Sequence, residues 1–117
     1  MDLDINAISK EYSEKNILVI GDIILDAYIY GKIDRISQEA PVPIVAINNK
    51  EFKPGGAANV ALNLNGLGVN VTLIGISGKD IDSQNLRNCF TGIDGINNQT
   101  IECIDRPTSI KTRIIAD

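Results

Sequence analysis

The sequence of 117 residues contains no histidine and no tryptophan, and only 4% of it is aromatic. Without histidine, the chain cannot form a histidine-ligated metal site, a Ser-His or Cys-His nucleophile pair, or a site that uses histidine as its general base. The two cysteines, Cys89 and Cys103, are too few for a disulfide scaffold or a four-cysteine zinc site. We expect both to be reduced thiols in the protein core.

Long apolar runs and an excess of basic charge are also missing. No run approaches the roughly 18 apolar residues that a membrane helix needs, and the first residues lack the pattern of a signal peptide. Eleven Lys and Arg against fifteen Asp and Glu give a net charge of -4, which argues against broad phosphate neutralisation by a nucleic-acid-binding protein. We therefore expect a cytoplasmic protein that binds neither a membrane nor a nucleic acid.

The hydrophobic pattern predicts an α/β fold. Apolar residues at three- and four-residue intervals indicate helices, and short continuous or alternating apolar runs indicate strands. The helices are predicted at 3–15, 57–67 and 83–90, and the strands at 17–20, 28–30, 42–47, 69–76, 100–104 and 110–116. This alternation is typical of a sheet with right-handed crossovers.

Three of these strands carry more specific expectations. The continuous apolar run at 17–20 predicts a strand that is buried on both faces. Pro41 and Pro43 cannot donate ladder hydrogen bonds, so the strands at 28–30 and 42–47 should lie at an edge or project from the main sheet. The sequence stops directly after the strand at 110–116, which would leave a sheet edge exposed, so we expect part of a longer domain.

Glycine-rich segments of this sequence do not fit the common nucleotide-binding motifs. In the segment 75–80, Asp80 stands where a phosphate loop requires Ser or Thr. After the first predicted strand, Gly21 stands alone, without the other glycines of a dinucleotide fingerprint. The acidic start of a calcium loop at 80–84 lacks the turn glycine and the closing Glu. We predict instead that Asp80 caps the following helix.

Polar and glycine residues follow two predicted elements where a ligand could approach. Asp22 and Asp26 come after the first strand, where a carboxylate can accept two sugar hydroxyls or simply cap a turn. Gly55 and Gly56 open a helix and allow a ligand to approach its free N–H groups, while Asn59 adds an amide that both donates and accepts. The alternative is an ordinary loop-to-helix junction with an exposed Asn.

Two residue pairs share strand faces because their members lie two positions apart. Lys111 and Arg113 could hold one anion together, or could form an ordinary solvated strand face. Tyr28 and Tyr30 share a face as well, and we expect them to serve packing.

Four segments resemble a known protein family. Residues 55–61 (GGAANVA), with glycines at the right spacing downstream, resemble the N-terminal signature of the ribokinase-like (PfkB) carbohydrate kinases. Within that family, the segments 21–26, 35–43 and 107–113 are similar to the kinase part of the bifunctional heptose 7-phosphate kinases/ADP-heptose synthases. The likeness runs from about residue 16 to the last residue. It departs at Gln38, where relatives usually carry Pro, and at Ala27, where they often carry Arg.

The resemblance implies an ATP-dependent kinase that phosphorylates the anomeric hydroxyl of a heptose 7-phosphate, for ADP-heptose and lipopolysaccharide core synthesis. It also assigns residues to this sugar phosphate. The sugar would be lined by Asp26, Gly55, Gly56 and Asn59, and its 7-phosphate would be held by Lys111 and Arg113.

For the fold, the resemblance implies a ribokinase-like α/β sheet with a projecting β lid at about 28–47, which pairs with a second subunit in a homodimer. Residues 1–117 would then be the N-terminal portion of the kinase domain. The ATP-binding half, the catalytic Asp and the nucleotidyltransferase domain would lie beyond Asp117. ATP and Mg²⁺ would belong to the full-length enzyme, and we expect this chain alone to bind neither, to hold no metal and to be inactive.

Three alternatives stay open at this point. The chain could belong to another PfkB-type kinase, acting on ribose, fructose or a nucleoside; an unphosphorylated sugar would give Lys111 and Arg113 no anion to bind. It could be a non-catalytic sugar-binding or dimerisation remnant of a truncated gene. It could also be an unrelated α/β binding module.

Overall fold

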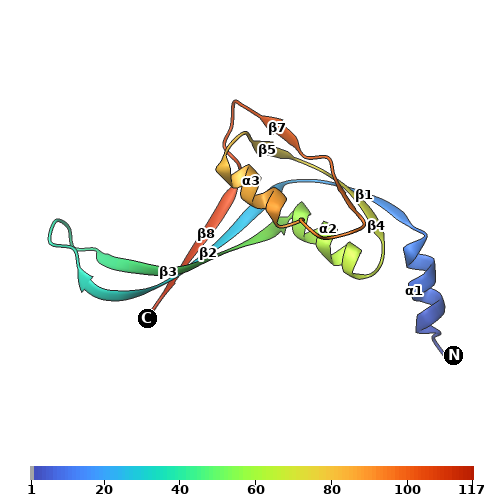
Figure 1. Cartoon of the computed structure of the whole chain (residues 1–117), viewed down its shortest axis with the longest axis horizontal. Coiled ribbons are helices and arrows are strands. Elements are labelled where there is room, and N and C mark those ends of the chain that lie inside the picture. The colour runs from blue at the N-terminus through green and yellow to red at the C-terminus, as the bar shows by residue number, and fades with distance from the viewer. Residues whose placement is uncertain (1) are drawn as a thin grey trace.

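The computed structural model describes residues 2–117 and has the mixed α/β architecture that the sequence predicts (Figure 1). The helices in this range are α1 (Ile5–Ser13), α2 (Ala57–Gly66) and α3 (Ile81–Asn88). The strands are β1 (Asn16–Ile20), β2 (Ile23–Ile36), β3 (Pro43–Gly56), β4 (Asn70–Ile74), β5 (Ile76–Gly78), β6 (Ile96–Asn98), β7 (Ile101–Cys103) and β8 (Ile110–Ala116).

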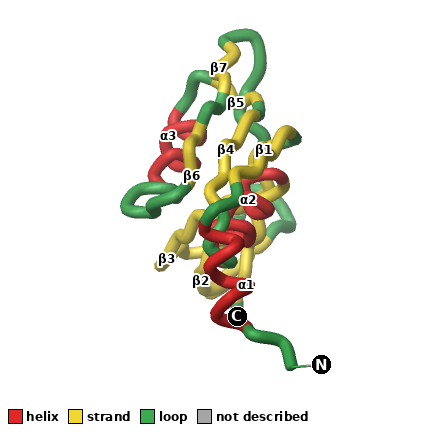
Figure 2. The backbone as a smooth tube through the Cα atoms, turned by 90° about the vertical axis from the view of Figure 1, so that its right-hand side faces the viewer, coloured by secondary structure: helices red, strands yellow, loops and turns green. Residues whose placement is uncertain are grey.

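The body of the molecule is built on a parallel sheet in the order β1-β4-β6, whose strands lie side by side in Figure 2. A second, two-stranded parallel sheet pairs β5 with β7. Helix α2 packs on the parallel sheet and α3 lies beside the root of β2 and β3. The buried core residues come from β2, α2, β4 and α3 and from the position directly before β4: Ile23, Leu25, Ala58, Ala61, Val69, Val71, Leu73 and Leu86.

The strands β2 and β3 form a long antiparallel hairpin that projects from this body (Figure 1). Strand β8 pairs with β2 in parallel, which gives the order β3-β2-β8. Because of the hairpin, the longest dimension is 65 Å and the radius of gyration is 18.7 Å, against about 13 Å for a compact domain of this size. The projecting element predicted from the prolines is confirmed: Pro43 begins β3, which is an edge strand.

The hairpin strands are much longer than the predicted segments 28–30 and 42–47. The polar residues at 32–36, which resemble a loop in the sequence, continue β2 and pair with the start of β3. They can do so because both faces of the outer ribbon meet solvent, so no apolar alternation is required of them. The turn itself is short, and the N–H of Ser37 donates to the carbonyl of Val42 at 2.8 Å.

Two other predicted strands differ in their limits. The segment 69–76 is divided at Gly75, where the Ile23 side chain lies so close that a β-carbon would overlap it. The segment 100–104 contains only β7, and the preceding β6 was missed because its three residues, Ile-Asn-Asn, are too short to show a period.

Burial of β1 differs from the prediction. We expected 17–20 to be buried on both faces, but Leu18 is 54% and Ile20 is 70% exposed. Val19 alone among these residues packs against the core. The reason is that, within residues 2–117, β1 pairs only with β4 and its second edge and face are not covered.

Helix caps follow the sequence closely. Asp4 caps α1, and Asp80 caps α3 by accepting a hydrogen bond from the Ser83 N–H at 2.8 Å, as predicted. Both cysteines are free thiols, as predicted, and both are half-buried. Cys89 packs against the core, where burial raises the pKa of its thiol, whereas Cys103 lies outside the core cluster. In the described part of the chain, no helix has the length and apolar character needed to cross a membrane.

Candidate functional site

Asp26 lies on β2 with a lysine opposite it on each neighbouring strand. It pairs in register with Lys53 of β3 and with Lys111 of β8, and such pairs point to the same face of a sheet. Asp26 Oδ1 lies 3.0 Å from Lys111 Nζ and 3.9 Å from Arg113 Nη1. Lys111 and Arg113 therefore share one face, as their spacing predicted, and both cations face the same carboxylate.

The Asp26 carboxylate combines burial with unused hydrogen-bonding capacity. Its side chain is only 16% exposed, and its Oδ1 atom is buried. Within residues 2–117 no group donates a well-directed hydrogen bond to Oδ1, although the Lys111 ammonium is close. A ligand that draws the Lys111 ammonium away would therefore expose this oxygen as an acceptor for its hydroxyl.

The two glycines that end β3 bring the start of α2 close to this carboxylate. A β-carbon on Gly55 would lie 2.8 Å from Asp26 Oδ2, so the carboxylate needs the absence of a side chain there. Gly56 has a φ of 56°, in the region that favours glycine, and is the N-cap of α2 without a side-chain cap. The N–H of Ala57 donates to the carbonyl of Asp22 at 2.8 Å, which fixes the start of the helix.

Asn59 and Asp22 lie at the border of this arrangement. Asn59 is exposed in the first turn of α2, and its side chain forms no hydrogen bond with other described residues. Asp22 is exposed and lines a cavity of about 340 Å³ whose walls are mainly isoleucines at the ends of β1 and β4 and at the starts of β2, β5 and β7. The structure therefore brings Asp26, Gly55, Lys111 and Arg113 together, and it places Asp22 against a different, largely apolar cavity.

Tyr28 extends the polar face one row further along the sheet. Its hydroxyl accepts a hydrogen bond from Arg113 Nη1 at 3.1 Å, and its ring lies 5.0 Å from Lys53 Nζ and 5.3 Å from the Arg113 guanidinium carbon. The prediction that Tyr28 serves packing omits these contacts. The alternation of 26, 28 and 30 with 111 and 113 could have indicated a shared face, but the strand pairing that joins them is not visible in the sequence.

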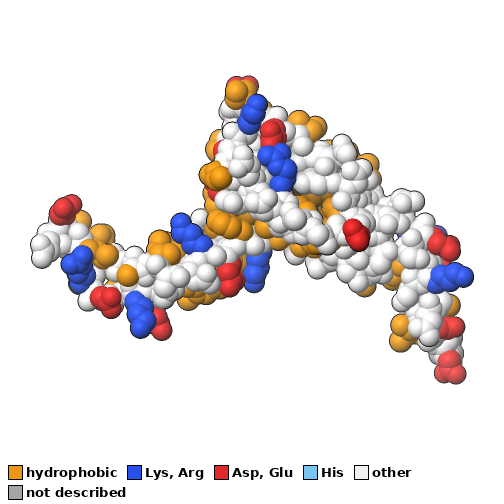
Figure 3. All heavy atoms as spheres, viewed as in Figure 1, with side chains coloured by type: hydrophobic (Ala, Val, Ile, Leu, Met, Phe, Trp, Pro, Cys, Tyr) orange, Lys and Arg blue, Asp and Glu red, His pale blue; other side chains and the backbone are white. Residues whose placement is uncertain are grey.

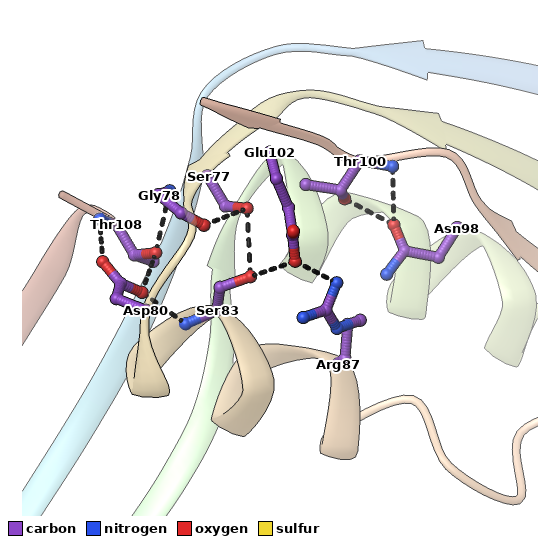
Figure 4. Close-up of polar contacts among 9 residues, drawn as sticks. All are labelled: Ser77, Gly78, Asp80, Ser83, Arg87, Asn98, Thr100, Glu102 and Thr108. Atoms are coloured by element: carbon purple, nitrogen blue, oxygen red, sulfur yellow. Dashed lines mark hydrogen bonds and ion pairs between the residues drawn. The ribbon is translucent and has the colours of Figure 1, made fainter. Parts of the chain in front are cut away.

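A second polar cluster, which sequence reasoning missed, fixes the start of β8 (Figure 4). Asp80 accepts hydrogen bonds from the Thr108 hydroxyl at 2.6 Å and the Thr108 N–H at 2.8 Å. The Thr108 hydroxyl accepts from the Gly78 N–H at 2.9 Å. The next residue, Ser109, accepts the Leu25 N–H at 2.9 Å through its carbonyl, so this cluster sets the register of β8 on β2.

The hydrogen bonds from Thr108, and after them the one from Ser83, hold the pKa of Asp80 below its ordinary value of 3.8. Beside this cluster, the Ser83 hydroxyl donates to the Glu102 carboxylate at 3.3 Å and lies 3.2 Å from the Ser77 hydroxyl, and the same carboxylate pairs with Arg87 (Figure 4). All of these groups have protein partners. The cluster is therefore a structural one that positions Lys111 and Arg113 indirectly.

Comparison with known proteins identifies the fold. The carbohydrate kinase from Agrobacterium tumefaciens matches with a TM-score of 0.66 and 24% identity, over 87% of this chain and 32% of that one. Phosphofructokinase-2 from Escherichia coli, solved in complex with substrates and products, matches with a TM-score of 0.62 and 20% identity, over 88% of this chain and 31% of that one. The projecting hairpin and the parallel sheet thus belong to a fold of carbohydrate kinases.

Sequence comparison shows to which family of carbohydrate kinases the chain belongs. The model of the pfkB family of carbohydrate kinases matches residues 14–116, and the chain belongs to this family. The bifunctional protein HldE of Vibrio atlanticus is 42% identical over 106 residues, which cover 91% of this chain and 22% of that protein. HldE of Methylobacillus flagellatus is 46% identical over 100 residues, covering 85% of this chain and 20% of that protein. The chain thus spans about a fifth of the length of these relatives.

Proposed function

We propose that this chain is the sugar-binding part of an ATP-dependent kinase that phosphorylates the anomeric hydroxyl of a heptose 7-phosphate, in the cytoplasm, on the route to ADP-heptose. The proposal rests on the Asp26 carboxylate, which is packed against Gly55 and faced by Lys111 and Arg113. A sugar that already carries a phosphate offers both of the groups that such a site can bind: hydroxyls for the carboxylate and an anion for the cations.

In this proposal each residue has one role. Asp26 accepts hydrogen bonds from sugar hydroxyls, and Gly55 leaves the space that this carboxylate occupies. Gly56 exposes the uncapped start of α2, where Asn59 adds an amide that can contact a further hydroxyl. Lys111 and Arg113 turn from Asp26 toward the 7-phosphate when it is bound.

Membership of a carbohydrate kinase family implies ATP with Mg²⁺, and ATP would supply the transferred phosphoryl group. Within residues 2–117 no three His, Cys, Asp or Glu side chains gather into a set that could hold a metal ion. We propose, from the family resemblance, that the residues for Mg²⁺ and for the catalytic base belong to the other part of the kinase domain. We propose that the chain forms the N-terminal portion of the kinase domain and does not transfer phosphate by itself.

The hairpin is the proposed lid and dimer contact, with the lid spanning about 28–47. Large hydrophobic side chains are exposed along its outer half, where Figure 3 shows them among charged groups. They are Ile33, Ile36, Val42, Ile44 and Ile47. Exposed apolar side chains on a ribbon that no other described element covers favour contact with a second subunit.

Calorimetric titration of heptose 7-phosphate into the purified chain tests the function, with unphosphorylated heptose as the control ligand and circular dichroism to confirm folding. We expect the phosphorylated sugar to bind more tightly by roughly tenfold or more, since charge-assisted hydrogen bonds are about twice as strong as neutral ones. Equal affinity for both sugars would instead favour a kinase of the same family that acts on an unphosphorylated sugar.

A further inference from the structure

Three cations from the two outer strands, β3 and β8, reach the same face of the β3-β2-β8 sheet. Lys53 of β3 and Lys111 of β8 stand opposite Asp26 on its two sides. Arg113 stands opposite Tyr28 in the next row. Of these three, Lys53 belongs to no motif that the sequence analysis singled out.

The three cations differ in the ion pairs that they form with the carboxylates of this face. Lys111 is committed to the Asp26 carboxylate at 3.0 Å, and Arg113 is divided between that carboxylate and the Tyr28 hydroxyl. Lys53 forms no ion pair with any carboxylate of residues 2–117, and its ammonium lies over the Tyr28 ring at 5.0 Å from the centroid. It is thus the cation of this face with unused capacity for an anion.

Tyr28 holds Lys53 and Arg113 toward one another. Its ring contacts both cations, at 5.0 and 5.3 Å, and its hydroxyl orients the guanidinium. Two like charges near one aromatic ring repel each other unless an anion lies close to both. Opposite Tyr28 on the other side, Glu51 adds the second carboxylate of this face, so three positive and two negative groups leave one net positive charge.

We propose that Lys53 is a third ligand of the phosphate group, and that Tyr28 is a positioning residue that holds Lys53 and Arg113 around it. The site then selects a sugar carrying a phosphate monoester, whose two negative charges need more than the partly neutralised pair Lys111 and Arg113. This inference rests on the proposed function, because it concerns the same sugar-phosphate site.

The test compares the affinity ratio for heptose 7-phosphate and heptose in wild type, Lys53→Gln, Lys53→Arg and Lys50→Gln. Lys50→Gln is the matched control. It removes the same charge from β3, but Lys50 stands opposite Ile29, on the face of the sheet away from Asp26. We expect Lys53→Gln to reduce the preference for the phosphorylated sugar about tenfold. Lys53→Arg and Lys50→Gln should retain it. A partly unfolded Lys53→Gln variant would bind both sugars less and would leave the ratio of their affinities unchanged.

Tyr28 variants separate positioning from packing. Tyr28→Phe retains the ring beneath both cations and should lose only part of the preference, whereas Tyr28→Leu should resemble Lys53→Gln. As a second measurement, NMR of the lysine side chains during titration with inorganic phosphate should show saturable shifts at Lys53 and Lys111 and none at Lys50.

The outcomes distinguish this inference from the proposed function. If wild type prefers heptose 7-phosphate and Lys53→Gln retains the full preference, or if phosphate shifts Lys111 and leaves Lys53 unchanged, Lys53 is not a phosphate ligand while the function stands. If wild type shows no preference and phosphate shifts neither lysine, the proposed function fails and the role of Lys53 fails with it.

Discussion

At the scale of single residues, Asp26 is the group on which the site depends. Its carboxylate neutralises part of the charge of Lys111 and Arg113 and still has a buried oxygen without a directed hydrogen bond. A sugar phosphate would replace these contacts at both places. Its phosphate would bind the two cations, and its hydroxyls would donate hydrogen bonds to the carboxylate. Binding at the two subsites should therefore be coupled through this one side chain.

Replacing the carboxylate by an amide tests that coupling. Asp26→Asn should weaken binding of heptose and heptose 7-phosphate by roughly 10- to 100-fold, since hydrogen bonds to charged groups contribute about 1.5–3 kcal/mol. Inorganic phosphate should bind at least as tightly as in wild type, because Lys111 and Arg113 lose their competing partner. Calorimetry measures all three affinities. A parallel loss of phosphate affinity would contradict the competition.

Gly55 provides the second test at this scale. Gly55→Ala would place a β-carbon 2.8 Å from Asp26 Oδ2, and we expect it to displace the carboxylate and to lower the free energy of unfolding by about 1–3 kcal/mol. Gly66→Ala is the control, since a β-carbon there meets no atom within 4 Å. Sugar titration and urea denaturation measure both effects. Equal behaviour of the two variants would show that the close approach at Gly55 is unimportant.

At the scale of elements, the register of β8 determines where Lys111 and Arg113 lie. That register depends on Asp80, whose carboxylate binds Thr108 directly before the strand. Sequence reasoning predicted Asp80 as a helix cap but not its bond to Thr108, since the two residues are 28 positions apart. Local signals such as helix caps and apolar periods can be read from the sequence, whereas contacts formed by strand pairing cannot.

The lowered pKa of Asp80 predicts a pH dependence of stability. Because its pKa is lower in the folded than in the unfolded chain, its contribution is fully present above the ordinary value of 3.8 and is lost as the pH falls through the folded-state pKa. The free energy of unfolding of wild type should therefore fall more steeply below about pH 4 than that of Asp80→Asn. Urea denaturation at a series of pH values measures this. Asp82→Asn, in the same helix, is the matched control, and equal slopes for wild type and Asp80→Asn would contradict the prediction.

At the scale of the whole molecule, the arrangement is an α/β body with a long ribbon extending from it. The sequence predicted the α/β class, the edge position of the prolines and the glycine-rich helix start. It did not predict the length of β2 and β3, because a ribbon exposed on both faces requires no hydrophobic alternation beyond its root. It also did not predict the exposure of β1, because burial depends on what covers a strand and not on its own residues.

The proposed dimer contact can be tested with two substitutions of similarly exposed isoleucines. Ile36, on the outer hairpin, is 65% exposed, and Ile20, at the end of β1, is 70% exposed. We expect wild type to sediment as a dimer, Ile36→Lys as a monomer and Ile20→Lys as a dimer, because a charge in an apolar contact is costly. Dissociation by Ile20→Lys with no effect of Ile36→Lys would place the contact at β1 instead of the hairpin.

The most direct test of the central claim is a crystal structure of this chain with heptose 7-phosphate bound. We predict sugar hydroxyls within hydrogen-bonding distance of Asp26, and the phosphate oxygens within reach of Lys111 and Arg113 on the same face of the β3-β2-β8 sheet. A sugar bound elsewhere, with Lys111 still paired to Asp26, would contradict the account.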